Sequence, residues 1–167
     1  MEFLAQFLGI AIAVLCILAL QMKKKWQIML VSAIANVLVS VNYLAFVGFS
    51  NAFFVSVLAA VQTTVGLFKS LKGKETSKTE KIIYLVLYMF FGVLGVKTIA
   101  DWLIVLAALL FCLAIFCKKA QGVRAFMVAN AATNVVYTIL VNSTTLYSQI
   151  FSLISGVIAL IRYRKKG

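Results

Sequence analysis

Long apolar stretches, each ended by charged residues, make up most of this chain. Five runs lack any charged residue and are 20, 43, 15, 16 and 37 residues long: Phe3–Met22, Trp26–Phe68, Ile82–Val96, Trp102–Cys117 and Ala125–Ile161. A helix needs about 17–25 apolar residues to cross a bilayer, so each of the two long runs predicts a pair of spanning helices. Turn-forming residues interrupt both, at Gly48–Asn51 and at Asn142–Thr145. The pattern therefore predicts an all-α, polytopic membrane bundle of seven transmembrane helices.

The two short runs, Ile82–Val96 and Trp102–Cys117, fall just below the usual length of a spanning helix. Lysines beside them, such as Lys81 and Lys97, can extend their side chains to the membrane surface and lengthen the effective span. A six-helix bundle, or a re-entrant arrangement of Ile82–Cys117, is the alternative.

Composition favours a membrane protein over a soluble one. Of the 167 residues, 64% are hydrophobic, and the chain contains neither proline nor histidine; soluble domains are about 45–50% apolar. The net charge of +12 would suggest nucleic acid in a soluble chain. Here the basic residues lie between apolar runs and form no basic face with interleaved aromatics. We therefore expect the lipid bilayer as a partner, and no nucleic acid.

The three cysteines lie inside apolar runs, at Cys16, Cys112 and Cys117. We interpret them as small buried hydrophobic residues without a disulfide framework. The first apolar run follows Met-Glu-Phe and lacks a preceding basic region. It is expected to be a retained helix rather than a cleaved signal peptide.

The distribution of charge predicts the orientation of the bundle. If successive helices alternate in direction, 15 of the 16 basic residues fall on one side of the membrane, and only Lys97 falls on the other. Cytoplasmic loops retain Lys and Arg. We therefore expect the amino terminus outside and the carboxyl terminus inside.

A weak internal repeat accompanies this topology. A shift of 98 residues aligns polar positions of two helices: Ser32 with Asn130, Asn36 with Asn134, and Ser40 with Thr138. Parallel repeats of this kind occur in transporters, and a single linker helix lets both copies run in the same direction. We divide the chain into a first three-helix repeat (1–71), a cytoplasmic linker (72–81), a linker helix (82–97) and a second three-helix repeat (98–167). This is a three-plus-one-plus-three arrangement.

Groups that perform acid–base catalysis or bind metals are scarce. The chain has no histidine, and its acidic residues, Glu2, Glu75, Glu80 and Asp101, lie outside the apolar runs. We expect no enzyme activity, no catalytic residue, no metal and no cofactor. Asp101 is interpreted as an interfacial charge, with a role in ion coupling as the alternative. Because proton-coupled carriers need titratable groups within the span, facilitated passage of a neutral solute is the simplest expectation.

Two lines of polar residues are the best candidates for a binding site. Positions about four residues apart lie on one face of a helix, and these lines comprise Ser32, Asn36 and Ser40, and Asn130, Asn134, Tyr137 and Thr138. Burying an unpartnered amide in lipid costs on the order of several kcal/mol, so both lines should face the bundle interior. There they line a substrate site or, alternatively, hold helices together by hydrogen bonds. Further donors and acceptors are Gln62, Thr63 and Thr64.

Three short motifs carry a resemblance to a known family: Leu4-Ala5-Gln6 followed by Leu8-Gly9, Arg124-Ala-Phe-Met, and the ending Ile161-Arg-Tyr-Arg-Lys-Lys-Gly167. With these motifs the chain resembles the bacterial YgjV-type inner-membrane proteins, which implies a multi-pass protein of the bacterial inner membrane. That family is similar in architecture to SWEET sugar transporters and bacterial nicotinamide riboside transporters. The similarity implies a three-plus-one-plus-three bundle with a central substrate site.

SWEET-like proteins carry a central pair of asparagines, so the resemblance makes Asn36 and Asn134 candidates, although that pair lies on a different helix of each repeat there. The proline hinges of SWEET-like first helices are absent here, which argues against gating by proline kinks. Glycines could supply flexibility instead, namely Gly66, Gly92, Gly95 and Gly156.

These observations lead to a transporter of a small neutral solute, such as a sugar, a nucleoside or a vitamin-like compound, that works by alternating access. The alternative is a non-transporting scaffold, sensor or accessory subunit. A polar cavity between Asn36 and Asn134 would favour transport, whereas direct amide bonds across a packed core would favour the scaffold. The sequence leaves open the substrate and whether the chain forms a homo-oligomer.

Overall fold

Seven α-helices and no strand make up the part of the chain that the computed structural model describes, residues 2–46, 48–140 and 146–164. In chain order they are α1 (Glu2–Gln21), α2 (Lys25–Phe46), α3 (Asn51–Leu71), α4 (Lys78–Leu94), α5 (Asp101–Phe116), α6 (Ala120–Leu140) and α7 (Leu146–Arg164). The all-α prediction is confirmed.

Three of these helices are long and apolar enough to cross a membrane by themselves: α2, residues 52–71 of α3, and α6. Two shorter apolar segments, Phe7–Gln21 and Asp101–Phe116, accompany them. Large apolar side chains also face outward every three to four residues. On α2 this stripe is between 39% and 50% exposed and consists of Leu30, Ile34, Val37, Val41 and Leu44. Such a stripe suits contact with lipid.

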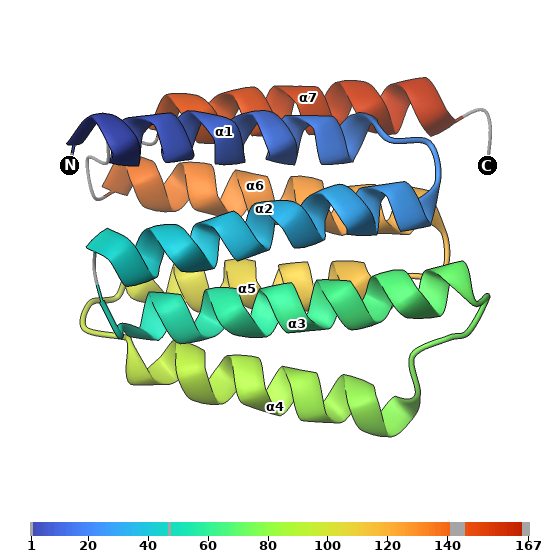
Figure 1. Ribbon diagram of the computed structural model, residues 1–167, viewed down its shortest axis with the longest axis horizontal. Helices are drawn as coiled ribbons and strands as arrows, with labels where there is room; N and C mark the ends of the chain where they lie inside the picture. The colour runs from blue at the N-terminus through green and yellow to red at the C-terminus, as the bar shows by residue number, and fades with distance from the viewer. Residues whose placement is uncertain (1, 47, 141–145, 165–167) are drawn as a thin grey trace.

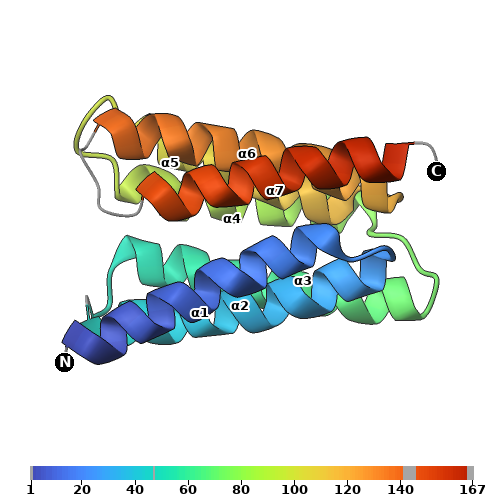
Figure 2. The ribbon, with the colours of Figure 1, turned by 90° about the horizontal axis from the view of Figure 1, so that it is seen from above.

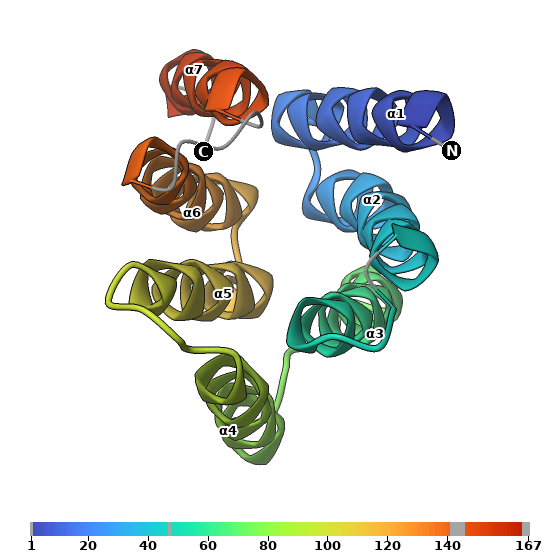
Figure 3. The ribbon, with the colours of Figure 1, turned by 90° about the vertical axis from the view of Figure 1, so that its left-hand side faces the viewer.

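The helices form two layers (Figure 3). One layer consists of α1, α2 and α3 side by side, the other of α7, α6 and α5, and α4 closes the edge between α3 and α5. At the opposite edge α1 packs against α7, while the two middle helices, α2 and α6, make few direct contacts. Figure 2 shows that α1 and α7 approach one another toward the C-terminal end of α7 and diverge toward the N-terminus.

The odd-numbered helices run in one direction along the bundle and the even-numbered helices run in the other (Figure 1). The loops after α1, α3 and α5 therefore meet at the end where α7 finishes, which we call the basic end. These three loops, residues 22–24, 72–77 and 117–119, place their lysines at the basic end. Lys97 lies in the α4–α5 loop at the other end.

The predicted break between the second and third helices is confirmed. Gly48 has a φ of 75°, a conformation that glycine adopts without a steric penalty. Ser50 then caps α3, because its side chain accepts a hydrogen bond from the Phe53 amide. The predicted break at Asn142–Thr145 lies outside the described residues.

The fourth helix begins earlier than the apolar run predicts. Ser77 and Glu80 form a capping box, so α4 starts at Lys78 and the loop that precedes it is shorter than the predicted linker. The Glu80 carboxylate also pairs with Lys69 at the end of α3. The hydrogen bond from Lys69, together with one from the Ser77 amide, lowers the pKa of Glu80, which lies outside the apolar run.

Two buried apolar clusters hold the layers together. Near the basic end, α2, α5 and α6 meet in a cluster of Ile28, Met29, Ala114, Ile115 and Val123. A second cluster, Ala59, Tyr88 and Cys112, joins α3, α4 and α5. The two layers therefore contact each other where α1 meets α7, where α3 meets α5, and at the basic end of α2.

The prediction of buried cysteines is only partly right. Cys112 is buried and Cys117 is half-buried, but Cys16 is exposed on α1. Because nearly every residue of α1 is apolar, its sequence does not mark the face that turns outward.

Candidate functional site

The first polar line lies on α2. Ser32 is buried and Asn36 is half-buried. The Asn36 side-chain amide donates to the Thr63 hydroxyl of α3 at 3.3 Å, and Ser40 donates to the Asn36 carbonyl of its own helix at 2.8 Å. At Asn36 this line therefore faces α3.

The second polar line lies on α6, the middle helix of the other layer. The Asn134 amide donates to Asn130 Oδ1 at 3.1 Å, and the Asn130 amide donates to the Ala107 carbonyl of α5 at 2.6 Å. Thr138 bonds to the Val135 carbonyl of its own helix, and Tyr137 is half-buried. The two asparagines thus form a chain of two hydrogen bonds that links α6 to α5.

The hydrogen bonds described here run from each asparagine to a neighbour in its own layer. Asn36 joins α2 to α3, and the pair Asn130–Asn134 joins α6 to α5. None of the bonds in the described part of the chain links Asn36 with Asn134. The structure therefore places the two lines on the facing middle helices without connecting them directly.

Among the additional polar residues of α3, Gln62 and Thr63 are almost completely buried. The Gln62 amide reaches across to α5 and donates to the Cys112 carbonyl at 3.2 Å. Thr63 accepts the bond from Asn36 and itself bonds within α3. Both side chains therefore connect helices at the middle of the bundle.

Asp101 lies where an interfacial acid is expected. Its carboxylate accepts hydrogen bonds from the backbone amides of Lys97 and Thr98, at 2.9 and 2.7 Å, in the loop before α5. These bonds lower the pKa of Asp101, which lies outside the apolar run. The carboxylate is thus engaged locally, at the end of the bundle opposite the basic end.

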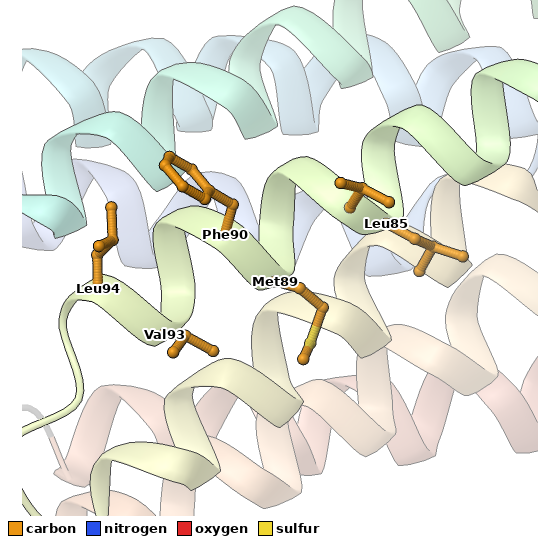
Figure 4. Close-up of a pocket in the computed structure, with 6 residues that line it drawn as sticks. Leu85, Met89, Phe90, Val93 and Leu94 are labelled. Carbon is orange, nitrogen blue, oxygen red and sulfur yellow. The ribbon is translucent and has the colours of Figure 1, made fainter.

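A pocket on the outer side of α4 is entirely apolar (Figure 4). It has a volume of about 500 Å³ and is lined by residues of that helix alone: Leu85, Val86, Met89, Phe90, Val93 and Leu94. These side chains offer no polar group to a ligand, so the pocket is suited to contact with lipid chains.

Arg124 is the most heavily bonded side chain that sequence reasoning overlooked. We counted it among the loop charges, but it lies inside α6 and is only 2% exposed. Its guanidinium donates to the Leu20 carbonyl at 3.1 Å, to the Lys23 carbonyl at 3.3 Å and to the Met22 carbonyl, and it lies 4.3 Å from the ring centre of Tyr163. A positive charge thus caps the carbonyl end of α1.

Gln21 extends these contacts to α7. Its amide donates to the carbonyl and the hydroxyl of Ser155 at 3.0 and 2.9 Å, and it accepts a bond from Arg162. The Tyr163 hydroxyl donates to the Gln21 carbonyl at 3.0 Å. We call these residues, Gln21, Arg124, Ser155, Arg162 and Tyr163, the Arg124 network; it fastens α1 to α6 and α7 at the basic end.

A compositional signal for Arg124 was present in the sequence. Every other basic residue before position 160 is a lysine. Only arginine presents a planar set of donors that can serve several carbonyls and stack on a ring. An isolated arginine in a lysine-rich chain therefore indicates a geometric requirement.

In the described residues, seven helices with outward apolar stripes and basic loops gathered at one end define a multi-pass helical membrane protein. A family model, Imp-YgjV, described as a bacterial inner membrane protein, matches residues 3–167. The chain belongs to this family and is a multi-pass protein of the bacterial inner membrane. No curated protein and no solved structure matches it. The resemblance to YgjV-type proteins is confirmed, whereas the wider relation to SWEET and nicotinamide riboside transporters stays a prediction.

Proposed function

We propose that this protein carries a small neutral solute across the inner membrane by alternating access, with a substrate site between α2 and α6. The observation that carries the proposal is the placement of the two polar lines. They occupy the middle helices of opposite layers, which make few direct contacts with each other. Ser32, Asn36 and Ser40 would form one wall of the site, and Asn130, Asn134 and Tyr137 the other.

The arrangement of helices supports a three-plus-one-plus-three parallel repeat. A half-turn about an axis along the bundle would exchange α1 with α5, α2 with α6 and α3 with α7 (Figure 3). The members of each pair run in the same direction (Figure 1). Under this proposal α4 is the linker helix, and the two layers are the bodies that rock against each other.

The contacts between the layers differ at the two ends of the bundle. At the basic end the layers are joined by the Arg124 network and by the buried apolar cluster that includes Ile28 and Val123. Toward the N-terminus α1 and α7 diverge (Figure 2). With the basic end in the cytoplasm, these contacts fasten the two layers together on the cytoplasmic side. Transport would then require the Arg124 network to open.

The orientation is testable with reporter fusions. We expect the amino terminus outside and the basic end inside, since cytoplasmic loops retain lysine and arginine. A fluorescent protein fused after Gly167 should fluoresce, and alkaline phosphatase at the same point should be inactive. Phosphatase inserted after Thr98 should be active. The reverse pattern of phosphatase activity would contradict the proposed orientation.

The substrate site is testable by ligand-induced stabilisation of the purified protein. A solute present at about 100 times its Kd should stabilise the protein by about 2.7 kcal/mol. We expect one class among neutral sugars, nucleosides and vitamin precursors to raise the Tm of the native protein but not that of Asn36→Ala or Asn134→Ala. The matched control is Thr64→Val, because the Thr64 hydroxyl bonds to the Ala60 carbonyl of its own helix; this variant should keep the shift.

A stabilising solute should then cross the membrane of proteoliposomes that contain the native protein. If no solute raises the Tm while both asparagine variants melt well below the native protein, the transport proposal is wrong.

That outcome would favour a second candidate function, a scaffold, sensor or accessory subunit. The bonds from Asn36 to Thr63 and from Asn130 to the Ala107 carbonyl favour it, because amides of this kind hold membrane helices together. Under either function we expect no enzyme activity, since the apolar runs contain no histidine, aspartate or glutamate. We also expect no nucleic-acid partner, since the basic residues lie between those runs.

A further inference from the structure

A small polar pocket lies at the basic end, apart from the polar lines. Its volume is about 180 Å³, below the roughly 300–1,000 Å³ of sites for drug-sized ligands. It is bounded by the start of α2, the end of α3, the α3–α4 loop, the start of α4 and the end of α5. We call it the linker pocket, and it is lined by Lys25, Ser70, Gly73, Lys74, Glu75, Thr76, Lys81, Phe116 and Lys118.

The lining of the linker pocket is strongly positive. It contains four lysines and one carboxylate, Glu75, which pairs with Lys118 at 2.8 Å. The ion pairs of the described residues engage Lys118 and Lys69, and not Lys25, Lys74 or Lys81. Ammonium groups that share a small pocket repel one another, so an anion between them would be stabilised.

Two of these lysines are held in place rather than extended into water. Lys25 and Lys81 are half-buried, and the Lys81 ammonium lies 5.9 Å from the ring centre of Phe116. Lys25 is the first residue of α2, and Thr76 precedes the residue that caps α4. The positive ends of the α2 and α4 dipoles and the negative ends of the α3 and α5 dipoles meet in this region, so the lysines, and not the dipoles, make it positive.

The remaining lining suits the oxygens of a tetrahedral anion. Ser70 and Thr76 bring hydroxyl donors. Gly73 has a φ of 64° and its amide donates to the Ser70 carbonyl at 3.4 Å, so it shapes the loop and supplies no free donor. Three ammonium groups and two hydroxyls around a small volume match the charge and the acceptors of a phosphate group.

We propose that the linker pocket binds a phosphate group, either of an anionic lipid or of a small soluble phosphate. It lies at the level of the helix ends, where the headgroups of a bilayer are within reach, and basic clusters beside membrane helices attract anionic lipids. The bound anion would fasten the α3–α4 loop to α2 and α5. The inference stands whether or not the protein transports a solute.

The test uses the purified full-length protein and a pair of charge-removing substitutions. We expect inorganic phosphate, against chloride at equal ionic strength, or short-chain phosphatidylglycerol, against phosphatidylcholine, to raise the Tm. The variant Lys25→Gln/Lys81→Gln should bind the active anion about tenfold more weakly or worse, because it loses two charged contacts. The control Lys72→Gln/Lys119→Gln removes two exposed lysines of the same end that do not line the pocket; it should bind like the native protein.

The two arms distinguish the source of the phosphate. A shift with phosphatidylglycerol alone identifies a lipid headgroup, and a shift with inorganic phosphate shows that the phosphate group is sufficient. Native mass spectrometry provides a second measurement that does not depend on Tm, since the pocket variant should retain less phosphatidylglycerol than the control. If neither anion shifts the Tm, or if both double variants lose binding equally, the proposal is wrong.

Discussion

Arg124→Ala is expected to lower the free energy of unfolding by about 3 kcal/mol or more. The guanidinium serves three carbonyls at the end of α1 and lies on the ring of Tyr163. Removing it leaves these carbonyls without their donor at a place that is largely shielded from water, and it also leaves a space between α6 and α1. Arg124→Lys should lower the free energy of unfolding by an intermediate amount, because one ammonium group cannot replace the several planar N–H donors of a guanidinium.

The measurement is the monodisperse fraction of purified protein after heating in detergent, which gives an apparent Tm for each variant. Arg162→Ala is the matched control: it is an exposed arginine of the same network with one bond to Gln21 at 3.2 Å. Exposed interactions of this kind contribute about 0–1 kcal/mol. Equal effects of Arg124→Ala and Arg162→Ala would show that burial of Arg124 does not stabilise the bundle.

The Arg124 network has a different role in each of the two proposed functions, so Arg124→Ala also bears on which function is right. In a scaffold the network only stabilises, so every weakened variant should simply melt earlier. In a carrier the same contacts close the cytoplasmic end and must open in each cycle. A residue that joins α6 to the end of α1 therefore affects stability and the balance between the two conformations together.

The helices could be predicted because charges end apolar runs in a membrane, but their bounds could not. Lys78 and Arg124 show the reason. Lys78 starts α4 because of the capping box of Ser77 and Glu80, and Arg124 lies within α6 because its charge is satisfied by carbonyls of α1. A rule that places every charge in a loop shortens both helices.

The candidate site, like the helices, could be predicted only in part from the sequence. Helical spacing places Asn36 and Ser40, or Asn130 and Asn134, on one face, and the structure brings each pair together. Their partners Thr63 and Ala107 depend on how α2 packs on α3 and α6 on α5, which spacing does not specify. The Arg124 network joins residues more than a hundred positions apart, so the sequence can single out Arg124 as an isolated arginine but cannot indicate its partners. A ligand-binding role of the asparagines stays a prediction.

Gly156→Val is expected to cost about 1–3 kcal/mol of stability because of overpacking between α6 and α7. A Cβ atom at Gly156 would lie 2.5 Å from Val128 Cγ2 and 3.4 Å from Leu20 Cδ1. The nearer atom belongs to a β-branched side chain, which is stiff in a helix and cannot rotate away cheaply. We suggested flexibility as a role for Gly156, but close packing gives a physical reason for a glycine here.

Gly156→Ala separates the two opposing effects of such a change. Alanine favours a helix interior over glycine by about 1 kcal/mol, whereas the contact with Val128 opposes it. We expect a net loss, because α7 would have to move away from α6 and would strain the bonds between Ser155 and Gln21. Gly9→Ala is the control, since a Cβ there meets nothing within 4 Å. In the same heating assay Gly9→Ala should melt at or above the native Tm and Gly156→Ala below it; equal values would contradict tight packing at this crossing.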